Sequence, residues 1–91
     1  MILVSFSSLE AAVADLNIAT GNPTEQWAEP GVANIGNFHI SQAYGSYALH
    51  QMTSTNGSVC SHIGYTTKTG LFVGIGHVLK GIDLGRATMA K

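Results

Sequence analysis

Charged side chains are scarce in this chain: Asp, Glu, Lys and Arg make up 10% of its 91 residues, against about 25% in a typical soluble domain. Lys and Arg are missing from residues 1–67, which hold four acidic residues and so carry a formal charge of −4. Residues 68–91 hold four basic residues and one acidic residue and carry +3. No dense basic face is available, so we expect no direct binding of nucleic acid, which depends on cations that displace counterions.

The low charge favours a surface that a partner covers, because such a surface offers little colloidal repulsion. The opposite charges of the two segments suit the orientation of a partner or the pairing of two copies, so a homodimer is possible. A monomer with a hydroxyl-rich surface fits the same composition, since cations near the end of a helix complement its dipole. The sequence leaves these alternatives open.

Cysteine occurs once, as Cys60, which excludes an internal disulfide and indicates a reducing compartment. No apolar run approaches the ~20 residues of a membrane span. The opening MILVSF is apolar but six residues long and has no basic residue before it, unlike a signal peptide. We therefore expect a cytoplasmic protein, with no membrane contact and one small domain over residues 1–91.

Motifs of nucleotide binding and of carboxylate catalysis are absent. Gly74 and Gly76, followed by Lys80, form neither a Walker loop nor the full dinucleotide fingerprint. All acidic residues except Asp83 precede residue 30, so no paired carboxylates are indicated. We expect neither enzymatic activity nor a cofactor.

Cys60 and His62 place a thiol and an imidazole two residues apart on one strand face, an arrangement that could begin a metal site. Two ligands do not close a zinc site, and side chains two apart on a strand lie ~6.5–7 Å from each other, beyond hydrogen-bond reach. A small-ligand or metal-binding domain built on this histidine-bearing hairpin is the alternative hypothesis for function.

Helical spacing marks the first element. The sequence SSLE at residues 7–10 has the form of a capping box, in which Ser7 begins the helix and Glu10 reaches back to it. Apolar residues follow at helical spacing, and Gly21 and Pro23 are typical of a helix end. We predict a helix over residues 8–19. The apolar stripe consists of Leu9, Ala12, Val13 and Leu16.

Residues 21–37 hold both prolines and three glycines, which indicates an ordered loop. Trp27 is the only tryptophan, and we expect it to anchor this loop to the core. The alternative is that Trp27 faces a partner as a binding anchor.

From Phe38 to Thr66 the pattern predicts an antiparallel sheet, with a turn or bulge at Gly45. Asn56 and Gly57 are typical of a two-residue type I′ turn. The pairs would then be Met52 with Ser61, Gln51 with His62, His50 with Ile63, and Ala48 with Tyr65. The expected core face carries Ala48, His50, Met52, Val59, Ile63 and Tyr65, and the other face carries Tyr47, Leu49, Gln51, Cys60 and His62.

A closing helix is predicted near residues 68–84. Its apolar stripe, expected to pack on Met52, Val59 and Ile63, is Leu71, Ile75, Val78, Leu79 and Ile82. A neighbouring stripe carries Gly70, Gly74, His77 and Gly81, where a backbone or ring can approach closely. The predicted fold class is α+β, with an N-terminal helix, a small antiparallel sheet and a C-terminal helix packed on the sheet.

The segments ATGNP, NFHISQAYGSYALHQM and GYTTKTGLFVGIGHVLKGI together resemble the small proteins of phage and prophage accessory regions. Anti-CRISPR proteins are similar in size and build. The resemblance implies a compact protein that occupies a surface of a host complex, such as CRISPR-Cas, without chemistry of its own. This chain departs from many such inhibitors in not being strongly acidic, which argues against DNA mimicry. No functional residue is transferred by the resemblance.

For a protein that acts in this way, the sequence predicts a contact surface made of the uncharged hairpin face and the glycine side of the last helix. Its anchors would be Tyr47, Gln51, His62 and His77, since aromatic side chains supply contact area at low entropic cost. A surface around Trp27 is the alternative.

Overall fold

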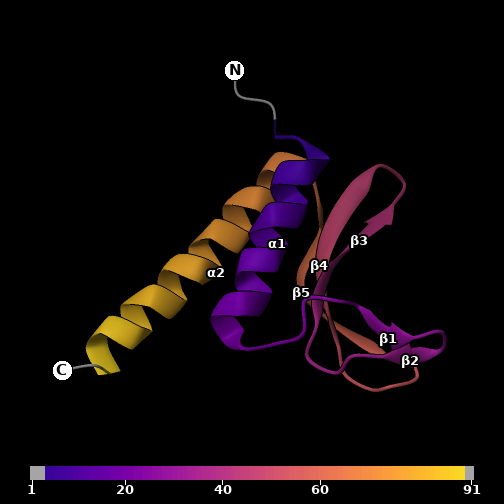
Figure 1. The fold of residues 1–91 in the computed structure, drawn as a ribbon. Helices are drawn as coiled ribbons and strands as arrows, with labels where there is room; N and C mark the ends of the chain where they lie inside the picture. Colours follow the sequence, from indigo (N-terminus) through magenta and orange to yellow (C-terminus); the bar gives the residue numbers. More distant parts are fainter. Residues whose placement is uncertain (1–3, 90–91) are drawn as a thin grey trace.

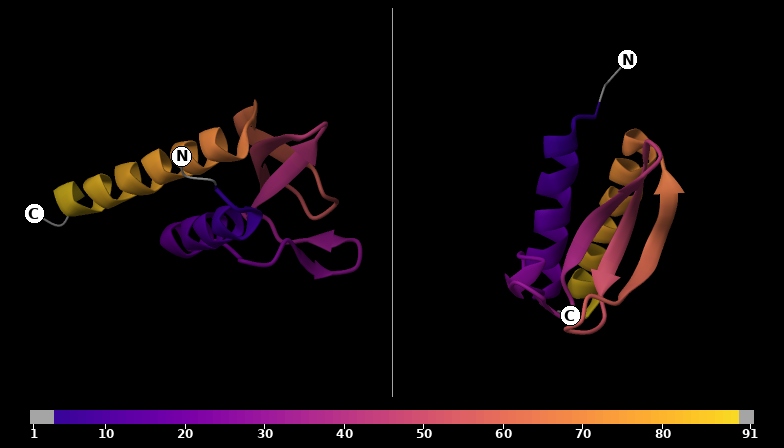
Figure 2. Two further views of the ribbon diagram at one scale, coloured as in Figure 1. Left: turned by 90° about the horizontal axis from the view of Figure 1, so that it is seen from above. Right: turned by 90° about the vertical axis from the view of Figure 1, so that its right-hand side faces the viewer.

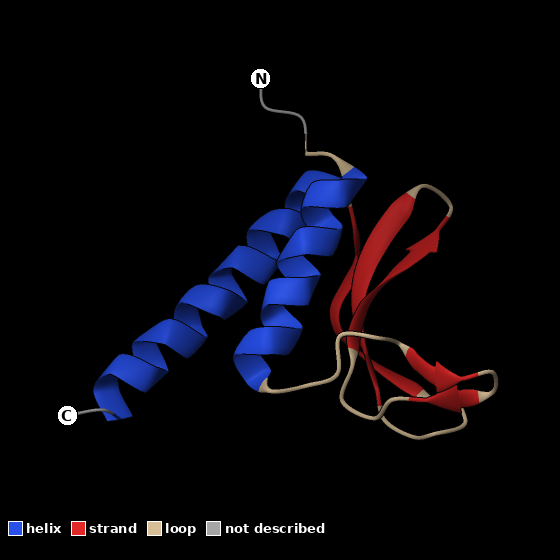
Figure 3. Ribbon diagram, viewed as in Figure 1, coloured by secondary structure: helices blue, strands red, loops and turns tan. Residues whose placement is uncertain are grey.

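The structure, a computed structural model, describes residues 4–89 of the chain, with side chains described as far as Arg86. Two helices lie on one side of a three-stranded antiparallel sheet, and a separate two-stranded sheet extends beside it (Figures 1 and 3). The predicted α+β class is confirmed. In chain order the elements are α1 (Phe6–Thr20), β1 (Trp27–Glu29), β2 (Val32–Ala33), β3 (Phe38–Ala43), β4 (Ser46–Met52), β5 (Val59–Thr66) and α2 (Lys68–Met89).

Helix α1 begins two residues before the predicted start. Its N-cap is Ser5, which has an extended backbone and whose hydroxyl accepts a hydrogen bond from the Ser8 amide at 3.2 Å. The predicted capping box at Ser7 is therefore wrong, because Ser7 already lies inside the first helical turn. The helix ends as predicted at Gly21, which adopts the left-handed conformation with a φ of 72°.

Residues 21–37 are more ordered than a loop, since they contain the hairpin β1–β2. Trp27 is 45% exposed and does not enter the core, contrary to expectation. Its ring lies against Gly57, where a Cβ would come within 3.1 Å of the ring. The amide of Ala33 also donates to the Thr55 carbonyl, so β1–β2 docks on the loop between β4 and β5.

Of the two hairpin turns of the main sheet, the one predicted at Gly45 is confirmed and the second differs from the prediction. Tyr44 and Gly45 both have positive φ, 50° and 75°, and make the two-residue turn between β3 and β4. At the predicted turn only Gly57 has a positive φ, of 94°. The loop there spans residues 54–57 and is closed by a hydrogen bond from the Thr53 amide to the Ser58 carbonyl, so a two-residue turn at Asn56 is wrong.

This longer loop changes the pairing of β4 with β5. The observed pairs are Met52 with Val59, Gln51 with Cys60, His50 with Ser61, Leu49 with Ile63, and Tyr47 with Thr66. Between successive pairs β5 advances by one residue more than β4 in two places, so β5 contains two bulges. Three of the four predicted pairs are wrong. Leu49 joins the core beneath the helices, so alternation along β4 puts His50 and Met52 on the opposite face. The expected core face was therefore wrong for β4, and Val59 is 42% exposed, whereas Ile63 of β5 packs against the core as predicted.

The core lies between the sheet and the two helices. Figure 2 shows α1 along the β3 side of the sheet, and α2 contacts β4 and β5. Leu71 and Ile75 are fully buried, as predicted, but Val78 is 41% exposed. The buried cluster consists of Leu9, Val13, Leu16, Leu49, Leu71 and Ile75.

The glycine side of α2 is used within the molecule along its first turns. A Cβ on Gly74 would lie 3.0 Å from Ile63 Cδ1, and one on Gly70 would lie 2.6 Å from Thr66 Oγ1. These glycines let α2 approach β5 closely. Further along the same side, no atom from outside this part of the helix lies within 4 Å of the Cβ position of Gly81, so the glycine side is open there.

Candidate functional site

The five side chains predicted as partner anchors do not form one surface. Gln51 and His62 lie together on the helix-facing side of the sheet. Tyr47 is half-buried on the same side, where its ring packs 6.2 Å from that of Phe6. His77 is exposed on α2, and Trp27 is half-exposed on β1. Their role in binding a partner stays a prediction.

Cys60 and His62 are closer than the sequence indicated. The Cys60 thiol lies 3.4 Å from Nε2 of His62, and the same nitrogen lies 2.7 Å from Oε1 of Gln51. The Gln51 amide nitrogen donates to the Gly36 carbonyl at 3.2 Å, which turns Oε1 toward the imidazole. His62 therefore carries its proton on Nε2 and donates it to Gln51. A base for the thiol would need a lone pair at that nitrogen, so this arrangement does not activate Cys60.

A pair of histidines lies on the opposite face of the sheet. The rings of His39 and His50 are 5.9 Å apart, and His50 also meets Tyr65 edge-on at 6.0 Å. Over the residues that the structure describes, no three His, Cys, Asp or Glu side chains are grouped so as to hold a metal ion. The pair of His39 and His50 is thus separate from the contacts that His62 makes with Cys60 and Gln51.

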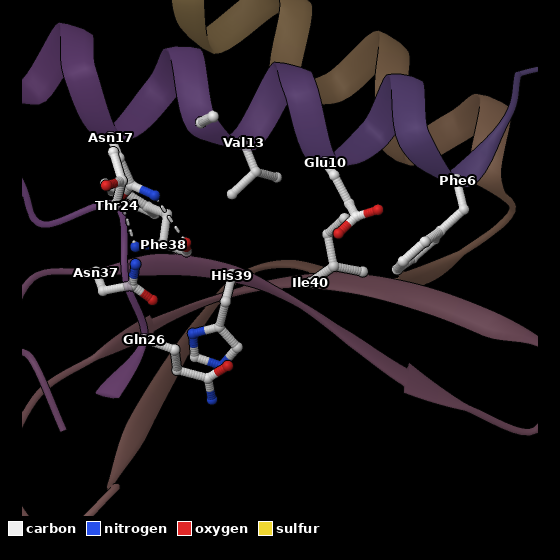
Figure 4. A pocket seen from close by; sticks show the side chains of 11 residues that line it. Phe6, Glu10, Val13, Asn17, Thr24, Gln26, Asn37, Phe38, His39 and Ile40 are labelled. Atoms are coloured by element: carbon white, nitrogen blue, oxygen red, sulfur yellow. Dashed lines mark hydrogen bonds between the residues drawn. The ribbon is translucent and has the colours of Figure 1, made fainter. Parts of the chain in front are cut away.

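A groove runs between α1 and the outer edge of β3 (Figure 4). Its volume is about 250 Å³. The residues that line it come from α1, from the segment before β1 and from the start of β3. They are Phe6, Glu10, Val13, Ala14, Asn17, Thr24, Gln26, Asn37, Phe38, His39 and Ile40.

Asn17 closes one end of this groove. Its Nδ2 donates to the Phe38 carbonyl at 3.0 Å, and its Oδ1 accepts from the Phe38 amide at 2.7 Å. The side chain, 1% exposed, therefore satisfies both main-chain groups of one residue of β3, as a neighbouring strand would.

These bonds fix the direction of the main-chain groups along β3. In an antiparallel pair, alternate residues point their amide and carbonyl groups to opposite sides of the strand. Because Phe38 points away from β4, Ile40 and Gln42 point away as well, and the unbroken register of β3 with β4 keeps this alternation. No hydrogen bond from another described segment reaches the outward groups of Ile40 or Gln42. β3 thus presents a free edge beside the groove.

The groove has one charged side chain, Glu10, whose carboxylate points toward Ile40 in Figure 4. Two buried polar atoms at its other end, Oδ1 of Asn37 and Nδ1 of His39, make no hydrogen bond. Burial lowers the pKa of His39, and the nearby His50 lowers this pKa further, against an opposing effect of the Asn37 backbone. His39 is therefore held neutral, and the electrostatic character of the groove is set by Glu10.

A second, more apolar groove lies between the two helices. It is lined mainly by small and apolar side chains, among them that of the exposed Phe72. Its lining residues are Ser8, Ala11, Ala12, Asp15, Phe72, Gly76 and Leu79.

Sequence reasoning missed the residues that make the edge groove. Asn17 carried a signal, since it is a polar residue adjoining the apolar stripe of α1. Glu10 was interpreted as a helix cap, and the outward direction of Ile40 and Gln42 depends on strand order, which a single sequence does not reveal.

Comparison with protein-family models, with curated proteins and with solved structures found no match to this chain. Within residues 4–89, no helix is both long and apolar enough to cross a membrane.

Proposed function

We propose that this chain is a protein-binding domain without catalytic chemistry, which captures an extended segment of a partner along the free edge of β3. The observation that carries the proposal is the outward direction of the main-chain groups of Ile40 and Gln42. An unpaired edge of this kind is a template for another strand, which binds through main-chain hydrogen bonds.

The edge of β3 is suited to this role because it has none of the usual protections. Natural edge strands are blocked by Pro, by charged side chains, by bulges or by being very short. The six residues of β3, FHISQA, include no Pro and no charge, and their pairing with β4 has no bulge. The other edge strand, β5, is bulged in two places, which makes it a poorer template.

The absence of an activated nucleophile at Cys60 supports a binding role over an enzymatic one. A host protein complex in the cytoplasm, such as a CRISPR-Cas defence complex, is the partner suggested by the resemblance to phage accessory proteins. Strand addition is one way in which a small protein occupies the surface of such a complex. The groove beside the edge supplies room for alternate side chains of the added segment.

The substitution Gln42→Pro tests the proposal. Gln42 is exposed and its amide points away from β4, so proline removes an edge donor without removing a bond of the sheet. The probe is the acetylated, amidated peptide Thr-Val-Xaa-Val-Thr, with Xaa either norleucine or lysine, titrated into the ¹⁵N-labelled protein.

We expect peptide binding to shift the amide resonances of Ile40 and Gln42 and to slow their hydrogen exchange. Gln42→Pro should abolish binding, whereas the control Gln42→Thr should retain it with the same circular dichroism spectrum. Binding that is equally strong in the proline variant, or shifts confined to β5 and α2, would disprove strand addition at β3.

A further inference from the structure

The groove beside β3 also indicates the chemistry of the segment that it takes, on the condition that the proposed strand addition is correct. Glu10 is the one charged residue among those that line the groove, and it forms no ion pair with the described residues. Two of the described cations are engaged elsewhere: Lys68 lies 5.9 Å from the centre of the Tyr47 ring, and Arg86 donates to the Ala19 carbonyl. The carboxylate of Glu10 is therefore open to a cation supplied by a ligand.

The position of Glu10 relative to the edge selects one side chain of an added strand. Residues directly opposite each other in two paired strands place their side chains on the same face of the sheet. Ile40 points toward α1, on the side of Glu10 (Figure 4). A residue that pairs with Ile40 would thus direct its own side chain into the groove, toward Glu10.

The walls between Ile40 and Glu10 suit an aliphatic stem that ends in a charge. Phe6 is partly exposed at 37%, and Val13 and Ile40 add apolar surface. A lysine or arginine side chain can cover such surface with its methylene groups while its charged end reaches a carboxylate. An acidic side chain at this position would meet Glu10 and be repelled.

A second copy of this chain fits the edge less well. Antiparallel pairing of two β3 strands about a two-fold axis would place both Glu10 carboxylates on one side of the joined sheet, near the seam. Like charges at that position oppose the pairing. The sequence of β3 has no basic residue to offer in exchange.

We infer that the partner segment is an extended, otherwise uncharged strand that carries a lysine or arginine opposite Ile40, held by Glu10 in the groove between α1 and β3. The unpartnered Oδ1 of Asn37, in a side chain 1% exposed, marks the other end of the groove as a further acceptor for a donor of the same segment.

The test compares three forms of the Thr-Val-Xaa-Val-Thr peptide, in which Xaa is lysine, norleucine or glutamate. Dissociation constants come from amide chemical shifts of the full chain. For the wild type we expect lysine to bind about two- to fivefold more tightly than norleucine, the range for a partly exposed ion pair. Glutamate should bind most weakly.

Glu10→Gln should abolish the preference for lysine, and 0.5 M salt should reduce it. Asp15→Asn is the matched control: it removes the same charge from α1, but Asp15 lines the groove between the helices, so the preference should persist.

Equal binding of lysine and norleucine by the wild type would overturn the inference and leave strand addition intact. Failure of all three peptides to shift Ile40 and Gln42 would instead refute the proposed function. A dimer in sedimentation that becomes a monomer on Gln42→Pro would show that a second copy occupies the edge, and would also overturn the inference.

Discussion

At the scale of single residues, Asn17 decides where the free edge of β3 begins. Its amide group occupies the place of a neighbouring strand at Phe38, and the two hydrogen bonds also tie α1 to the sheet. The edge that remains open starts one pair further along, at Ile40. One buried side chain thus both stabilises the fold and limits the length of a bound segment.

We expect Asn17→Ala to lower the free energy of unfolding by about 1–3 kcal/mol, because it leaves the partly buried amide and carbonyl of Phe38 without these hydrogen bonds. Urea denaturation measures this change. Asn17→Asp keeps the acceptor for the amide but turns a second acceptor toward the carbonyl, so it should be at least as destabilising at neutral pH. A loss below 0.5 kcal/mol for both variants would contradict the role of Asn17.

His39 makes stability depend on pH. Burial and the nearby His50 lower its pKa from the ordinary value of 6.5. As the pH falls below 6.5, the unfolded chain takes up the proton before the folded protein does, so the free energy of unfolding decreases. The decrease should level off once the pH is below the folded pKa, and this residue should have no effect above pH 7.5.

Urea denaturation at a series of pH values from 8 to 5 measures this dependence. His39→Gln should flatten the curve over the range in which the two states differ in protonation. His77→Gln, at an exposed position on α2, should leave the slope unchanged. A slope that persists in the His39 variant would assign the effect to another group.

At the scale of elements, the rotation of α2 about its axis separates two aliphatic side chains of one predicted stripe. Ile75 is fully buried in the core, whereas Val78 is 41% exposed to solvent. We expect Ile75→Ala to cost about 2–5 kcal/mol through lost contacts and a cavity. Val78→Ala should cost less than about 0.5 kcal/mol, as surface substitutions usually do. Comparable losses for both variants, measured by denaturation, would show that α2 is rotated differently.

The elements that a sequence predicts well are those whose signal is local. Helical periodicity and the end at Gly21 located α1 and α2 to within a few residues, because both depend on side chains one or two turns apart. The register of the hairpin β4–β5 was not predicted correctly. It depends on a four-residue loop and on bulges, and the alternation of apolar and polar residues along a strand encodes neither. Because the register was predicted wrongly, the core face of β4 was predicted wrongly as well.

The same limit applies to the candidate site. The groove is made by α1 and β3, whose lining residues lie up to 34 positions apart, from Phe6 to Ile40. The contact of His62 with Gln51 was predicted for the wrong reason, since the two side chains meet although their backbones are not paired. The sequence therefore indicated which polar side chains interact, but it did not indicate on which face of the sheet they lie.

At the scale of the whole molecule, the offset between the helical layer and the sheet produces the groove. α1 lies along the β3 side of the sheet and leaves the strand edge uncovered below it (Figures 2 and 4). All residues that line the groove belong to residues 1–67, the part of the chain that has no Lys or Arg. The one charged side chain that lines the groove is the acidic Glu10, so the local charge beside the open edge favours a cation.

The docking of Trp27 on Gly57 has a consequence for how the folding of this protein is observed. The only indole lies on the small β1–β2 sheet, outside the cluster of Leu9, Leu49 and Ile75. Its fluorescence emission accordingly reports the seating of one hairpin on a loop, whereas far-ultraviolet circular dichroism follows the helices. Coincidence of the two signals during denaturation is a test of two-state behaviour, and here it would measure whether a peripheral hairpin and the core melt as one cooperative unit.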